Sequence, residues 1–209
     1  MLLGIQGSGK GTQAKRIAAE YDSPHVATGD ILRKAVEDET QLGRQVEGIL
    51  ERGELVPDAT MIELIRERLT DSDGFVLDGF PRTMAQAEAL DDMLTQIGRP
   101  LDVVFVLQVP DDVARERLAK RALEEGRADD TPDAIDTRIA TYHRETEPIV
   151  EHYRARGSLV PIPGTGTVED VFRHVQDALE QVAQRPVRGS GPVERAWGNR
   201  EVPPARTEA

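Results

Sequence analysis

The stretch Gly4-Ile5-Gln6-Gly7-Ser8-Gly9-Lys10-Gly11-Thr12 lies almost at the N-terminus and decides the fold. It matches the pattern G-x-x-x-x-G-K, in which glycines allow backbone N–H groups to turn inward around a phosphate. Apolar residues precede it, and those that follow, from Ala14 to Tyr21, have helical spacing. This strand–loop–helix context predicts a phosphate-binding loop at the positive end of a helix dipole. Lys10 would reach the phosphates as a point charge.

One position of this loop departs from the commonest form of the pattern. Gly11 follows the lysine where Ser or Thr usually binds Mg²⁺, and the hydroxyl comes one residue later, at Thr12. For this stretch taken alone, the alternative is a glycine-rich turn that binds nothing.

Composition restricts the classes of function. A chain of 209 residues is expected to form one domain, and its formal net charge of -12 argues against a nucleic-acid partner. We find no run of about eighteen apolar residues and no basic segment before an apolar one, so neither a membrane span nor a secretory signal is expected. The chain has no cysteine, which excludes disulfides and cysteine-ligated zinc. We therefore expect a cytoplasmic protein.

Strand-like and helix-like stretches alternate along the chain. After the first strand, apolar extended runs occur at 24–27, 74–78, 103–109 and 158–162. The alternation predicts an α/β fold with three layers, in which a five-stranded parallel sheet lies between helices. Ligands bind beyond the carboxyl ends of such strands, so the loops that follow them should meet at one edge.

Glycine and proline predict several boundaries. Pro148 is expected to interrupt a helix over 132–156, and Gly53 to end a helix over 42–52. Thr28-Gly29-Asp30 is expected to be a turn. Only three residues precede Gly4, so either the first strand is short and weak or the true start of the chain lies upstream. Residues 184–209, rich in Pro, Gly, Arg and Glu, predict a disordered tail.

Arginines are concentrated in or beside the loops that follow the predicted strands. They are Arg33, Arg82, Arg117, Arg121, Arg127 and Arg138. A guanidinium fork binds phosphate oxygens bidentately, and phosphoryl transfer depends on positive charge at the transferred group. For any one arginine the alternative is a surface ion pair of little energetic value. Their placement relative to the strand ends favours phosphoryl transfer.

Over about residues 1–183 the chain resembles the adenylate kinases of the nucleoside-monophosphate kinase family, in their short-lid form. The resemblance rests on the loop at 4–12 followed by Gln13, on ATGDILR at 27–33, on GELVPD at 53–58, and above all on LDGFPRT at 77–83 with Gln86. The glycine after the lysine is typical of these kinases.

The resemblance implies a phosphotransferase that moves the terminal phosphoryl group of ATP reversibly to AMP, giving two ADP, with Mg²⁺ and without zinc. It implies a monomer that serves adenine nucleotide homeostasis. It also implies one kinase domain over 1–183, divided into a core (1–26, 57–119, 131–183), a helical segment that binds the nucleoside monophosphate (NMP; 27–56) and a short lid (120–130).

The resemblance also implies roles for individual residues. The ATP-binding set is Gly7, Ser8, Gly9, Lys10, Gly11, Thr12, Arg117, Arg121 and Gly166. The AMP-binding set is Thr28, Arg33, Glu54, Leu55, Val56, Gly79, Phe80, Pro81, Arg82, Gln86, Arg127 and Arg138. The catalytic set is Lys10, Arg82, Arg121, Arg127 and Arg138.

Four side chains can be interpreted individually. Gln86 suits adenine because an amide both donates and accepts hydrogen bonds. Asp78 would orient Mg²⁺ through waters, since Mg²⁺ gives up its hydration reluctantly. A helix cap or turn is the alternative for Asp78. Asp129 and Asp130 would pair with arginines of the lid, or else belong to a solvated acidic loop.

Other functions were weighed against this one. A UMP/CMP kinase shares the fold and the short lid, but Thr28-Gly29 and Thr83 with Gln86 favour AMP. A non-catalytic nucleotide-binding protein would be expected to lack Lys10 or several arginines, and all of them are present. Hydrolysis of ATP without AMP is the third alternative.

Overall fold

The computed structural model describes residues 1–69, 74–127 and 129–184, so the predicted tail lies outside the described residues from 185 onward. The described elements are β1 (Leu2–Leu3), α1 (Lys10–Glu20), β2 (His25–Ala27), α2 (Thr28–Glu37), α3 (Gln41–Glu51), α4 (Asp58–Leu69), β3 (Val76–Asp78), α5 (Met84–Gln96), β4 (Val104–Gln108), α6 (Asp111–Glu125), α7 (Pro132–Thr141), η1 (Tyr142–Thr146), α8 (Glu147–Ala155), β5 (Leu159–Pro163) and α9 (Val168–Ala183). Within the described ranges, every helix is too short or too polar to cross a bilayer.

The five strands form one parallel sheet in the order β2-β3-β1-β4-β5, which confirms the predicted fold class. β1 is central, with Leu2 paired to Asp78 of β3 and to Phe105 of β4. Parallel neighbours require crossover connections, and helices supply them here. The central position of β1 places the glycine-rich loop in the middle of the sheet's carboxyl edge.

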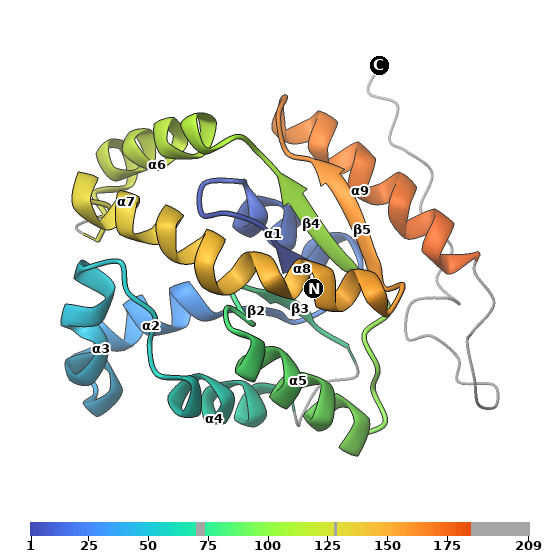
Figure 1. The fold of residues 1–209 in the computed structure, drawn as a ribbon, viewed down its shortest axis with the longest axis horizontal. Coiled ribbons are helices and arrows are strands. Elements are labelled where there is room, and N and C mark those ends of the chain that lie inside the picture. Colours follow the sequence, from blue (N-terminus) through green and yellow to red (C-terminus); the bar gives the residue numbers. More distant parts are fainter. Residues whose placement is uncertain (70–73, 128, 185–209) are drawn as a thin grey trace.

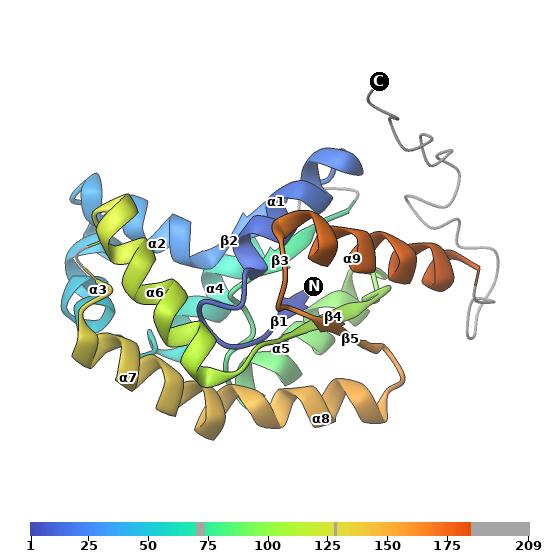
Figure 2. The same ribbon diagram turned by 90° about the horizontal axis from the view of Figure 1, so that it is seen from above.

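Alternation along the strands divides the core into two layers. Leu3 and Val106 pack with residues of α4, α5 and α8 on one face of the sheet. Leu2 and Phe105 pack with residues of α1 and α9 on the other face. Successive side chains of a strand point to opposite faces, so a fully buried strand must be apolar throughout. Figure 2 shows α1 and α9 on one side of the sheet and α5 and α8 on the other.

Hydrogen bonds hold the short first strand in the sheet from Met1 onward. The Met1 amino group donates a hydrogen bond of 3.0 Å to the Val103 carbonyl, and the Met1 carbonyl accepts one of 2.9 Å from Phe105 N. Burial lowers the pKa of this amino group to about 5, so the neutral amine is the form that lies in the core. Leu2 is 1 % exposed. The two-residue strand is therefore firmly paired on the β4 side.

Four helices gather at one end of the molecule. In Figure 1, α2 and α3 lie below the left end of the sheet, and α6 and α7 lie above it. The prediction of a turn at Thr28-Gly29-Asp30 was wrong, because α2 begins at Thr28 directly after β2. Ala27, still extended, is the N-cap, and Asp30 lies in the first turn, where the helix dipole favours a carboxylate.

The helix before the expected lid extends into that segment, and the helix after it begins at Pro132, as predicted. α6 continues to Glu125, so the first part of segment 120–130 is helical. Gly126 ends that helix with a φ of 62°, a conformation that costs glycine little. The interruption predicted at Pro148 is confirmed. The π-helical turn η1 separates α7 from α8, and the proline occupies the first turn of α8, where its missing N–H is harmless.

Close packing of α2 on α3 depends on the absence of a side chain at Gly43. A Cβ built there would lie 1.9 Å from the Ala35 carbonyl oxygen, which belongs to the backbone of α2. We expect Gly43→Ala to lower the free energy of unfolding by about 1–3 kcal/mol, measured by urea denaturation. Gly48→Ala, in the same helix, is the matched control. Its Cβ would meet only the flexible end of Arg52, so the gain in helix propensity should leave stability equal or raised. Equal effects of the two changes would contradict this account.

Candidate active site

Most of the predicted site residues line one cavity of about 770 Å³ at the carboxyl edge of the sheet. They are Gly7, Gly9, Lys10, Gly11, Thr12, Thr28, Arg33, Glu54, Leu55, Val56, Asp78, Gly79, Pro81, Arg82, Gln86, Arg117, Arg121, Arg127 and Arg138. They come from the loop after β1 and the start of α1, from α2, from the connector before α4, from the end of β3 to the start of α5, and from α6, α7 and the connection between them. Segments that are far apart in the sequence thus share one polar cavity.

Three predicted residues lie outside that lining. Ser8 and Phe80 are buried, with exposures of 1 % and 0 %, and support the loops from beneath. Gly166 is exposed in the turn before α9. Two residues on from it, Val168 does line the cavity and is itself 51 % exposed.

The structure adds lining residues that the sequence did not indicate. They are Gln6, Lys15, Arg16, Leu32, Leu50, Met61, Lys120 and Val168, among others. The apolar members have helical spacing, which predicts core and says nothing of a ligand. The basic lining residues look like ordinary solvated residues in the sequence. Only the other cations beside them in the folded protein mark them as part of the site.

The glycines of the loop are required by close backbone contacts. A Cβ on Gly4 would lie 2.6 Å from the Leu107 carbonyl oxygen, and one on Gly7 would lie 2.5 Å from that of Ala114. Both glycines also have positive φ values, of 136° and 84°. Lys10 Nζ donates to the carbonyls of Gly4 and Ile5, at 2.6 and 2.8 Å. The loop is therefore shaped before any ligand arrives.

A close contact with the end of a neighbouring strand explains why glycine follows the lysine. A Cβ built on Gly11 would lie 3.2 Å from Asp78 Oδ2, a distance tighter than most real Cβ contacts. Asp78 ends β3, and its side chain is 15 % exposed. The carboxylate of one strand thus lies beside the position where other phosphate-binding loops carry a hydroxyl.

Two cations that line the cavity have lost part of their solvation because they are buried. Burial lowers the pKa of Lys10 to about 8, an effect that Asp78 partly offsets and that Arg82 and Arg121 reinforce. Burial likewise lowers the pKa of Arg82 to about 10. Both groups are still mainly protonated at neutral pH. Charged groups with incomplete solvation attract an anion strongly.

Two buried carboxylates hold the arginines that face the cavity. Asp130, whose side chain is 0 % exposed, pairs with Arg121 at 2.7 Å and with Arg138. Asp129 pairs with Arg138 at 2.7 Å and lies 3.8 Å from Arg33. The expected pairing of these aspartates with arginines is confirmed, and neither belongs to a solvated loop. The pairs hold the guanidinium groups together despite their mutual repulsion.

Other contacts hold the remaining arginines near strand ends. Arg117 Nη1 donates at 2.9 Å to the carbonyl of Gly164, in the loop after β5. Arg127 pairs with Glu125 at 2.6 Å, within the α6–α7 connection. Arg82 Nε donates at 2.7 Å to the Gly79 carbonyl, which fixes the guanidinium in the loop after β3.

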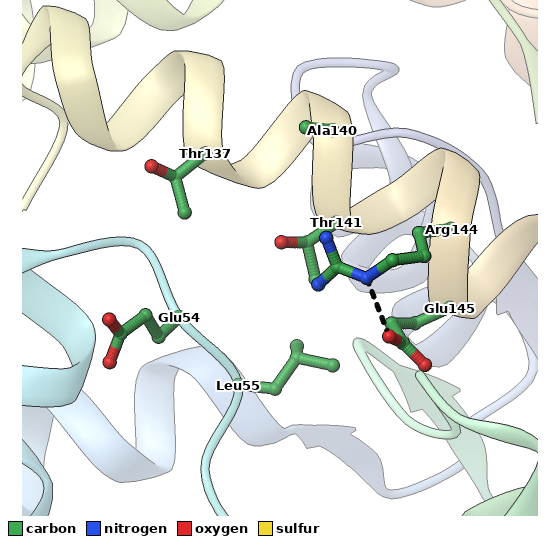
Figure 3. Close-up of a pocket in the computed structure, with 7 residues that line it drawn as sticks. All are labelled: Glu54, Leu55, Thr137, Ala140, Thr141, Arg144 and Glu145. Atoms are coloured by element: carbon green, nitrogen blue, oxygen red, sulfur yellow. Dashed lines mark hydrogen bonds and ion pairs between the residues drawn. The ribbon is translucent and has the colours of Figure 1, made fainter.

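A second, smaller cavity of about 490 Å³ lies between the connector before α4 and the helix pair α7–η1. Figure 3 shows Glu54 and Leu55 on one side and Thr137, Thr141 and Arg144 on the other. Arg144 pairs with its neighbour Glu145 at 2.7 Å. Glu54 and Leu55 line both cavities, so they separate the two.

Comparison with known proteins identifies the family. A family model described as adenylate kinase matches residues 2–158. The chain belongs to the adenylate kinase family. Its relatives include adenylate kinases of a Cyanothece species, 47% identical over 87% of this chain and 95% of the relative, and of Caulobacter vibrioides, 46% identical over 88% and 97%. That of Bifidobacterium longum is 43% identical over 86% of this chain and 98% of the relative.

Membership of the adenylate kinase family gives the function as well as the fold. The enzyme is a phosphotransferase with adenylate kinase function, as the motifs predicted. The parallel sheet flanked by helices agrees with this family. The roles of individual residues stay predictions, since the comparisons concern the chain as a whole.

The buried carboxylate at Asp130 should contribute far more stability than a similar exposed group. Asp130→Ala removes one of the two buried carboxylates that pair with Arg138, which is 8 % exposed, and it also removes the carboxylate that pairs with Arg121. We expect a loss of about 3 kcal/mol in the free energy of unfolding without nucleotide, measured in urea. The matched control is Asp136→Ala, which removes an exposed pair with Arg115 at 2.8 Å and should cost under about 1 kcal/mol. Similar losses would refute the distinction.

Proposed function

We propose that the chain transfers the terminal phosphoryl group of ATP reversibly to AMP, giving two ADP, within the larger cavity. The observation that carries this is the convergence of Lys10, Arg82, Arg121 and Arg138 on one cavity. Transfer of a phosphoryl group requires positioning and positive charge more than covalent help from the protein. A cavity lined by these cations meets that requirement.

ATP is proposed to bind on the side of the glycine-rich loop. The backbone N–H groups from Gly7 to Thr12 would hold its phosphates, with Lys10 placed to balance their charge. Arg117 would stack on the base, since a guanidinium is planar, and Gly166 would meet the base through its backbone. Arg121 would contact the transferred group. The hydrogen bond from Arg117 to Gly164 supports this assignment by holding the guanidinium beside the loop after β5.

AMP is proposed to bind between α2 and the loop after β3. Arg33 and Arg82 would hold its phosphate, and Arg127 and Arg138 would approach the phosphoryl group in transfer. Thr28 and Gln86 would contact the base. The backbone of Glu54, Leu55, Val56, Gly79, Phe80 and Pro81 would complete the site.

Mg²⁺ is the proposed cofactor, held by Asp78 through water. A lone carboxylate fits this ion, which keeps several waters and binds phosphate oxygens in preference to a full cage of protein ligands. The described residues contain no cluster of three His, Asp or Glu side chains suited to a metal, in agreement with such loose attachment. When bound, the ion would neutralise part of the phosphate charge. Asp78 orients it from the end of β3.

Exclusion of water is the remaining requirement. Water competes with AMP for the phosphoryl group, so we propose that the NMP-binding segment (27–56) and the lid (120–130) close only when both substrates are bound. Release of product would then limit turnover. We propose that the enzyme acts as a monomer, as the resemblance implies, and in the cytoplasm, as the composition indicates.

A panel of phosphoryl acceptors tests the proposed reaction. ATP and Mg²⁺ are supplied with AMP, CMP, UMP or GMP in turn, and formation of ADP is measured. AMP should give the highest kcat/KM. Higher activity with CMP or UMP would identify a pyrimidine enzyme, and release of phosphate without any acceptor would identify a hydrolase.

The forked geometry of the Arg82 guanidinium should contribute to turnover in addition to its charge. Arg82→Lys keeps a cation but loses both the bond to Gly79 and bidentate contact with phosphate. We expect kcat to fall on the order of 100-fold or more, measured at saturating ATP and AMP. Arg115→Lys, at an exposed ion pair, should leave kcat unchanged. Near-normal turnover of the Arg82 variant would remove this residue from the catalytic set.

A further inference from the structure

Both ends of the Gln86 side-chain amide are held by groups of fixed hydrogen-bonding character. Its Oε1 accepts from the backbone N–H of Arg82 at 2.8 Å. Its Nε2 donates to Asp58 Oδ1 at 2.7 Å. The side chain is 2 % exposed and lines the larger cavity. Little solvent is therefore available to replace either contact.

These two contacts fix the same orientation of the amide. A backbone N–H can only donate a hydrogen bond, and a carboxylate can only accept one. Rotation of the amide by half a turn would place Nε2 against the Arg82 N–H and Oε1 against the Asp58 carboxylate. Both contacts would then be repulsive, so the flipped form is strongly disfavoured.

Asp58 is itself held in place. Its Oδ1 also accepts from Thr83 Oγ1 at 3.0 Å, and the Thr83 hydroxyl oxygen accepts from Gln86 N at 3.2 Å. Asp58 begins α4, and Thr83 is the N-cap of α5. The network therefore joins the starts of two packed helices and leaves the amide of Gln86 little freedom.

A fixed amide offers a base only one arrangement of hydrogen-bond donor and acceptor. Each end of the Gln86 amide retains one bonding position, an N–H on Nε2 and a lone pair on Oε1. Adenine offers a donor at N6 and an acceptor at N1, which complement these positions. A 6-oxopurine offers an acceptor at O6 and a donor at N1, the reverse pattern. A freely rotating amide could pair with either purine edge, whereas the fixed one matches adenine and not a 6-oxopurine.

We propose that Asp58 is a positioning residue that selects adenine over 6-oxopurines by fixing the Gln86 amide. The inference rests on the proposed function, in which Gln86 contacts the base of AMP. Asp58 would act on the choice of base through Gln86 and touch no reacting atom.

The test compares AMP with IMP as phosphoryl acceptors. IMP carries the 6-oxo edge and lacks the 2-amino group of GMP, so the comparison isolates the donor–acceptor pattern from size. The ratio of kcat/KM for AMP to that for IMP should fall about tenfold or more in Asp58→Ala and Asp58→Ser. The serine variant keeps a polar residue at the start of α4, and its shorter side chain falls short of Gln86. Asp58→Asn should keep the ratio, since its amide oxygen accepts in the same place.

A control variant separates base selection from effects on helix stability. Asp133→Ala removes an exposed carboxylate from the first turn of α7, as Asp58→Ala removes one from the first turn of α4. It should leave the AMP:IMP ratio unchanged, and thermal melting monitored by circular dichroism reports any loss of fold. A merely structural role of Asp58 would lower kcat/KM for AMP and IMP by the same factor, and that result would overturn the proposal.

Gln86→Ala distinguishes failure of this inference from failure of the proposed function. Loss of the AMP preference in that variant, together with a lowered ratio in Asp58→Ala, supports the proposal. Loss of the preference in Gln86→Ala with an unchanged ratio in Asp58→Ala rejects the role of Asp58 alone. If Gln86→Ala keeps the preference, Gln86 does not read the base, and both the assigned adenine contact and the inference fail.

Discussion

Positive charge held away from water, in a chain whose net charge is -12, is the constraint on which the site depends. Lys10 and Arg82 both have lowered pKa values because they are buried, and both are still charged at neutral pH. Such cations repel one another. Asp78 offsets part of that repulsion for Lys10 and Arg82, and Asp129 and Asp130 pair with the neighbouring Arg121 and Arg138. Anionic phosphates would complete the compensation at the centre, which couples the charge distribution to the binding of a nucleotide.

The shape of the site depends on the backbone of the glycine-rich loop. Glycines with positive φ let the loop after β1 pass within contact distance of β4 and α6, and this contact sets the floor of the cavity. The close approach of Gly11 to Asp78 joins the loop to the end of β3. Because β1 lies between β3 and β4, residues that end or follow both neighbours line the same cavity. The order of the strands thus sets which side chains share the site.

The cavity combines two kinds of recognition. Arginines give strength without discriminating among nucleotides, since every nucleotide carries phosphate. The network around Gln86 contributes no positive charge and has a fixed hydrogen-bonding pattern. A site that leaves buried polar groups unpaired when the wrong base enters discriminates more strongly than one that relies on shape. Under the proposed function, affinity and choice of base would therefore come from different residues of one cavity.

Local patterns in the sequence were sufficient for the fold class, the glycine-rich loop and the set of arginines, because glycine spacing, apolar runs and helical periodicity each depend on residues close in the chain. The direct passage of β2 into α2 at Thr28 was missed, since turn residues and helix N-termini look alike in sequence. Only tertiary structure brought Gly11 beside Asp78, Asp130 between Arg121 and Arg138, and Asp58 onto Gln86. Those contacts depend on how elements pack, and packing distances are not encoded in spacing along the chain.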